Sequence, residues 1–161
     1  MNKVIAFTTY VALTARIIEI FSDSINKHIK GWKAETHHIN EYFKYGIPKD
    51  ISAIITLGIL RGTGHLLQDA AKKKIDRYYI DHAYFEPGYE GDCWLRISKN
   101  KHTMNYVKEV SDFRWKKFFS EKHPIMPWKT FHDRGDNILV IPPTSAICWY
   151  FNENEWQDYI L

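Results

Sequence analysis

The stretch ISAIITLGILRGTGHLLQDAAKKKIDRYYIDH, residues 51–82, decides the fold. It opens with the continuous apolar run Ile51–Leu57, which is typical of a buried parallel strand. A glycine-rich turn and an amphipathic helix follow, and Arg77–Asp81 is predicted to be the next strand. The apolar side of the helix consists of Leu66, Leu67, Ala70, Ala71 and Ile75. A strand, a helix and a second strand in this order predict an α/β fold with a mostly parallel sheet.

The preceding part of the chain repeats this alternation. Val4–Phe7 is a short apolar run that predicts a first strand, and Trp32–Ile39 predicts a second. Between them apolar residues recur at steps of three and four, which predicts a long helix that Thr8 or Thr9 caps and Gly31 ends. The residues in this pattern are Leu13, Ile17, Ile18, Phe21, Ile25 and Ile29.

The last third of the chain is predicted in less detail. Cys93–Ser98 and Asn137–Ile141 are predicted strands, and Pro142 with Pro143 stops the second of them. The pattern between them favours a helix with loops around it. The predicted helical elements are a segment around Val107–Phe119 and the short helices Thr144–Phe151 and Glu153–Leu161.

Composition excludes several classes of protein. A length of 161 residues predicts one domain, 1–161, and 45% hydrophobic with 25% charged residues excludes disorder, collagen and coiled coil. A net charge of +3 is too small to indicate a nucleic-acid binder. No apolar stretch approaches the roughly 18 residues of a membrane span, and the N-terminus lacks the features of a signal peptide. Two cysteines, predicted to be reduced and buried, favour a cytoplasmic protein.

The glycine-rich segment Gly58–Gly64 is the first candidate ligand site. Open parallel sheets bind ligands at the carboxyl ends of their strands, and a glycine turn there lets backbone N–H groups approach a phosphate. Arg61 could add a bidentate contact to that anion. The spacing matches neither a dinucleotide fingerprint nor a P-loop, so a tight turn that needs positive φ stays an equal alternative. The candidate ligand residues are Gly58, Arg61, Gly62, Thr63 and Gly64.

The segment YYIDHAYF, residues 78–85, carries the candidate catalytic residues. Asp81 could act as a general base, and His82 could act as a base or bind a phosphate. Tyr84 adds aromatic surface for a ligand beside them. Adjacent strand residues point to opposite faces, so Asp81 and His82 form a dyad only where the chain turns. The alternative is that Asp81 caps a turn and His82 is a hydrogen-bonded core residue.

Other polar and aromatic residues give weaker signals. Arg96, in a segment with His102 and Asn105, could bind an anion or form a surface ion pair. No metal-binding spacing of His and Cys is present. A group of aromatic residues has basic neighbours Arg114, Lys116 and Lys117, which leaves nucleic-acid binding open but not favoured. The aromatic residues are Trp115, Phe118, Phe119, Trp128 and Phe131.

Three segments together resemble a loose group of bacterial and phage proteins that look like glycosyltransferases. They are residues 58–70, 76–85 with 94–100, and 138–151, so the resemblance covers 51–151 well and the first 50 residues poorly. It implies a single Rossmann-like α/β domain, with a mostly parallel sheet of about five or six strands and helices on both faces. Such a domain would be the N-terminal, acceptor-side half of a GT-B glycosyltransferase.

The resemblance implies sugar transfer as the first function. Asp81 or His82 would deprotonate an acceptor hydroxyl that attacks a nucleotide sugar, the expected co-substrate; no other cofactor is implied. The donor-binding half does not follow within the chain, so we expect the domain to be inactive alone and to need a separate donor-binding chain or a homodimer. The alternative is a non-catalytic, phage-type protein in the host cytoplasm that sequesters a nucleotide or a partner protein. An apolar C-terminus also favours a partner; it contains Trp156, Tyr159, Ile160 and Leu161.

Overall fold

The structure is a computed structural model of the chain, and it divides into two compact units, Met1–Met104 and Asn105–Leu161. Whether both belong to one domain stays a prediction. The structure describes residues 1–83, 85–88, 91, 93–102, 111–123, 142–152 and 155.

The N-terminal unit is built on a five-stranded sheet with the strand order β2-β1-β3-β4-β5. The first four strands are parallel, and β5 runs antiparallel to β4. The α/β class and the mostly parallel sheet are therefore confirmed, and the sheet is mixed. The strands are β1 (Asn2–Thr8), β2 (Trp32–His38), β3 (Ala53–Leu57), β4 (Asp76–His82) and β5 (Leu95–Lys99).

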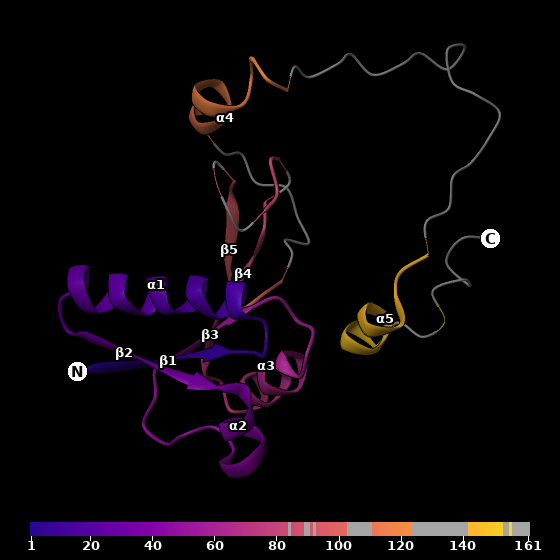
Figure 1. The fold of residues 1–161 in the computed structure, drawn as a ribbon. Coiled ribbons are helices and arrows are strands. Elements are labelled where there is room, and N and C mark those ends of the chain that lie inside the picture. Colours follow the sequence, from indigo (N-terminus) through magenta and orange to yellow (C-terminus); the bar gives the residue numbers. More distant parts are fainter. Residues whose placement is uncertain are drawn as a thin grey trace. The chain divides into compact units, whose positions relative to one another are not determined.

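Helices cover both faces of this sheet (Figure 1). On one face lies α1 (Ala12–His28), and on the other lie α2 (Ile39–Tyr45) and α3 (Thr63–Lys72). The α1 face holds a cluster of buried aliphatic side chains from four strands, β1 to β4, which α1 completes with Ile17 and Ile18. On the opposite face α3 contributes buried apolar residues of its own. These are Leu66, Leu67 and Ala70.

Local sequence explains why α1 and α2 begin where they do. The N-cap of α1 is Val11, without a side-chain cap, so the predicted capping by Thr8 or Thr9 is wrong. Thr14 instead donates from its hydroxyl to the Val11 carbonyl at 2.8 Å. The sequence did not predict α2, which a capping box stabilises. In this box the His38 ring accepts from the Asn40 N–H at 3.2 Å, and Glu41 accepts from the His38 N–H at 3.0 Å.

β5 runs antiparallel to β4, and hydrogen bonds within the connection between them fold the chain back. After β4 the chain turns back, and Trp94 both accepts from the Ala83 N–H and donates to the Glu86 carbonyl, each at 3.1 Å. None of the described residues of this connection is helical, whereas a parallel β5 would usually need a crossover helix. The predicted strand Asn137–Ile141 and the predicted helix Glu153–Leu161 lie outside the described residues, apart from Glu155.

The C-terminal unit contributes two short helices to the described part of the chain. They are α4 (Phe113–Phe118) and α5 (Ser145–Phe151), and α5 matches the predicted helix at 144–151. Both cysteines are free thiols, Cys148 buried and Cys93 partly exposed. None of the helices that the structure describes combines the length and apolar character needed to cross a membrane.

Candidate functional site

The carboxyl ends of the parallel strands bring the two predicted site segments to one edge of the sheet. Because β3 and β4 are parallel neighbours, the loops after Leu57 and His82 leave from the same edge. The Gly58 N–H donates to the Ile80 carbonyl at 2.7 Å, so the glycine loop starts directly against the end of β4. Tyr84, the aromatic residue predicted to line this site, lies outside the described residues.

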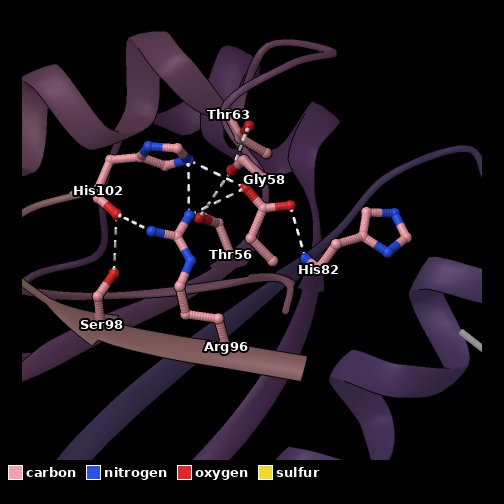
Figure 2. Close-up of polar contacts among 8 residues, drawn as sticks. Thr56, Gly58, Thr63, His82, Arg96, Ser98 and His102 are labelled. Atoms are coloured by element: carbon pink, nitrogen blue, oxygen red, sulfur yellow. Dashed lines mark hydrogen bonds and ion pairs between the residues drawn. The ribbon is translucent and has the colours of Figure 1, made fainter. Parts of the chain in front are cut away.

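The glycine loop is fixed by its own hydrogen bonds. The Thr56 and Thr63 hydroxyls donate to the Gly58 carbonyl at 3.3 and 3.2 Å (Figure 2). Thr63 also donates to the Leu60 carbonyl at 2.7 Å. Both threonines are fully buried. Thr63, predicted to contact a ligand, therefore holds the loop in place.

Gly62 is required by packing as well as by backbone conformation. Its φ is 90°, and a Cβ atom there would lie 2.7 Å from the Phe43 ring of α2. Gly64 is buried in the first turn of α3. We expected Gly62 and Gly64 to present open N–H groups to an anion. The start of α3 is instead covered, at Gly62 by the Phe43 ring and at Gly64 by burial. A ligand would therefore have to contact other residues of this loop.

Leu60 and Arg61 are the exposed members of the loop, and Gly58 is partly exposed with open space beside it. A Cβ atom on Gly58, whose φ is 69°, would meet nothing within 4 Å. Arg61 is exposed and adopts a φ of 59°, the left-handed region that side-chain-bearing residues seldom occupy. Among the described residues it makes no hydrogen bond or ion pair. The loop thus presents a guanidinium and an open backbone position at the edge of the sheet.

A second polar cluster joins the ends of β4 and β5. Asp81 is opposite Arg96 in the antiparallel register, with Arg96 Nη2 3.5 Å from Asp81 Oδ2. His102 Nε2 lies 3.0 Å from the same oxygen. Arg96 also donates to the His102 carbonyl at 2.8 Å, and Ser98 reaches that carbonyl at 3.4 Å (Figure 2). The predicted surface ion pair of Arg96 is therefore present, and its partner is Asp81.

These contacts set the acid strength of Asp81. The hydrogen bond from His102 holds its pKa below the usual value, and the His82 N–H and the charges of His102 and Arg96 act in the same direction. Partial burial opposes them. Asp81 Oδ1 accepts from the His82 N–H at 2.8 Å, so both carboxylate oxygens have donors. A carboxylate held in this way is a weak general base.

Asp81 and His82 do not form a dyad. They are adjacent in a regular strand, so their side chains point to opposite faces, as Figure 2 shows for the His82 ring, which points away from Arg96 and His102. His102 takes the place beside Asp81 instead. The sequence placed His102 near Arg96 but gave no signal that both would meet Asp81, because that contact depends on the register of β4 and β5.

A separate hollow of about 270 Å³ lies on the α1 face. Its lining is aliphatic and aromatic, and none of the described site residues contributes to it. It is formed by Val4, Phe21, Ile25, Ile29, Trp32, Ile55, Tyr78, Ile80 and Ile97. In the part of the chain that the structure describes, no group of three or more His, Cys, Asp or Glu side chains is arranged to hold a metal ion.

A scan against protein-family models and searches of curated proteins and of solved structures found no match to this chain. The functional argument therefore depends on the geometry of the sheet edge.

Proposed function

We propose that the N-terminal unit binds a phosphate-bearing small molecule, of the nucleotide or nucleotide-sugar class, at the carboxyl edge of its parallel strands. The proposal treats the sheet as doubly wound and Rossmann-like. Neighbouring strands β1 and β3 send their chains to α1 and α3, on opposite faces, which creates a topological switch point. Ligands of open α/β sheets bind in the crevice at such a point.

The conformation of Arg61 is the observation that carries this proposal. A left-handed backbone costs a residue with a side chain about 1–2 kcal/mol, and glycine would avoid that cost. Arg61 nevertheless occupies this position, next to Gly62, with an exposed guanidinium that has no partner among the described residues. Strain of this kind at a strand end is a reason to assign function. A guanidinium is suited to hold a phosphate through two parallel hydrogen bonds.

Gly58 supports the same assignment. The open space beside it lets a ligand approach the backbone more closely than any side chain would allow. The two threonine hydroxyls fix the Gly58 carbonyl before a ligand arrives, so binding would cost little ordering of the loop. Because the Gly58 N–H already donates to the Ile80 carbonyl, Gly58 gives the ligand room and Arg61 gives the polar contact of the proposal.

We favour binding without turnover, because Asp81, one of the two candidate bases, is held on both carboxylate oxygens by His82 and His102. A general base should have a pKa near the working pH, whereas the pKa of Asp81 is lowered by its donors. We therefore propose a non-catalytic protein that binds its ligand without converting it. Sugar transfer remains the second candidate, because Asp81 lies at the same edge as Gly58, directly after Ile80.

Calorimetric titration of the full chain tests the proposal. The ligands are pyrophosphate, a nucleoside diphosphate, a nucleotide sugar and the uncharged nucleoside. We expect the phosphate-bearing ligands to bind and the nucleoside to bind much more weakly. Arg61→Ala should weaken the phosphate ligands about tenfold or more, the equivalent of one charge-assisted hydrogen bond. Lys74→Ala is the matched control, since Lys74 is also exposed and left-handed but follows the other end of α3.

Each outcome of the titration has a consequence. Equal affinity of the nucleoside and the diphosphate would reject an anion site. Equal losses in Arg61→Ala and Lys74→Ala would show general charge attraction and reject the assignment of Arg61. Release of sugar or nucleotide from the nucleotide sugar by the chain alone would replace the binding function with catalysis.

A further inference from the structure

We propose that α4, in the C-terminal unit, is a binding site for single-stranded nucleic acid. The proposal concerns a different unit from the anion site and is independent of it. Its basis is an exposed array of two phenyl rings with a cation between them, formed by Phe113, Lys117 and Phe118.

The two sides of α4 have different characters. At about 3.6 residues per turn, Trp115 and Phe119 share one side, and their rings stack at 6.0 Å. Both are partly buried. Phe113, 61% exposed, and Phe118, 39% exposed, lie about 140° apart at the two margins of the remaining surface. The aromatic residues of this segment therefore split into a packed pair and an exposed pair.

Two cations lie on the exposed side, between the rings. Lys117 Nζ is 5.6 Å from the centre of the Phe113 ring and 5.1 Å from that of Phe118. Arg114, on the same side by helical spacing, is exposed and makes no ion pair within the described residues. The nearby acid Asp112 is occupied by Lys116, at 2.7 Å. The side with the rings is thus positively charged.

This arrangement matches the chemistry of single-stranded nucleic acid. Sequence-independent binders combine rings on which bases stack with cations that follow the phosphates. An anionic membrane surface favours a different pattern, in which the apolar residues of a helix occupy one face and the cations the other. On α4 both cations lie between the two rings by helical spacing, so rings and cations share one surface, which favours nucleic acid over a membrane.

Fluorescence anisotropy of the full chain with a labelled oligothymidylate of about twelve nucleotides tests this assignment. Titrations at several salt concentrations give both the affinity and its salt dependence. We expect Phe113→Ala and Phe118→Ala each to weaken binding about five- to tenfold, the lower end of the range for one stacked base. Lys117→Ala should also reduce the salt slope by about 0.7, as for one lost contact with a single strand.

The controls separate stacking from charge and from structure. Lys30→Ala removes an exposed cation of the N-terminal unit and should leave the affinity within twofold. Circular dichroism should show unchanged folding of the ring variants, because both rings are exposed. A duplex of the same length should bind more weakly than the single strand.

Three results would overturn the proposal. One is the absence of binding at low salt. Another is equal binding of duplex and single strand with no effect of the ring variants, which would leave only general charge attraction. The third is binding to vesicles of phosphatidylserine and phosphatidylcholine that depends on Phe113 and Phe118 while the oligonucleotide does not bind, which would assign the array to a membrane surface.

Discussion

Gly62, at the start of α3, and Phe43, in α2, are in such close contact that a Cβ atom on the glycine would lie 2.7 Å from the ring. Gly62 also has a φ of 90°, so two separate constraints require glycine there. The contact joins α2 to the glycine loop and covers the first turn of α3. It explains why the loop presents Arg61 and Gly58, and not the helix start, at the edge of the sheet.

Gly62→Ala should therefore destabilise the protein by more than the left-handed strain of about 1–2 kcal/mol, because the added Cβ must also displace the Phe43 ring, which is 57% exposed. Chemical denaturation measures this difference. Gly31→Ala is the matched control, because Gly31 has a φ of 83° with nothing within 4 Å of the added Cβ. The control should lose only the strain, about 1–2 kcal/mol. Equal losses in the two variants would contradict the contact with Phe43.

Thr63→Val tests the hydrogen bonds that fix the glycine loop. The variant keeps the shape of the side chain and removes bonds to two carbonyls, so we expect a loss of about 1–2 kcal/mol in unfolding free energy. Thr56→Val removes only the bond to Gly58 and should cost less. A larger loss in Thr56→Val would contradict the assignment of Thr63 as the main support of the loop.

The pair Asp81 and Arg96 should show measurable coupling. In a double-mutant cycle with Asp81→Asn and Arg96→Gln, we expect an interaction energy of about 0.5–1.5 kcal/mol, because both side chains are largely covered. The exposed pair Lys116 and Asp112 is the control and should couple by only a few tenths of a kcal/mol. Independent effects of Asp81→Asn and Arg96→Gln would mean that the cluster does not hold β4 and β5 together.

Acid stability should depend on Glu35. Hydrogen bonds from Lys3 and Lys33 lower its pKa from 4.5 to about 2. A carboxyl whose pKa is lower in the folded state stabilises the fold above its unfolded pKa, and this stabilisation is lost as the pH falls. Stability should therefore decrease between about pH 4.5 and pH 2, and less steeply in Glu35→Gln. Because Glu35 is partly exposed, high salt should reduce the difference. An identical pH profile for both proteins would exclude this contribution.

Periodicity in the sequence predicted most of the N-terminal unit. Apolar runs indicated β1 and β3, and the segments Trp32–Ile39 and Arg77–Asp81 were predicted as the strands that became β2 and β4. Apolar residues on one side of a helix indicated α1 and α3. The helix α2 was not predicted, because its N-cap is a histidine, His38, which is not among the usual capping residues. The direction of β5 could not be derived either, because alternation of apolar residues is the same in parallel and antiparallel edge strands.

For the site, the sequence identified residues more readily than their partners. It named Asp81, Arg96 and Arg61 from their positions beside predicted strands and turns. It could not show that Asp81 pairs with Arg96 and His102, because that depends on a strand register between distant segments. It also could not show that Phe43 covers Gly62, because α2 was not predicted. Only these long-range contacts show which candidate residues stabilise the fold and which are available to bind a ligand.

The most direct measurement of the central claim is the melting temperature of the Arg61→Gly variant with and without pyrophosphate. Glycine removes the left-handed strain, so without ligand the variant should be more stable than the natural sequence by about 0.5–1 kcal/mol. Pyrophosphate should then raise the melting temperature of the natural sequence and have little effect on the variant. Lys74→Gly should gain stability and still respond to pyrophosphate. An undiminished response in Arg61→Gly would contradict the anion site.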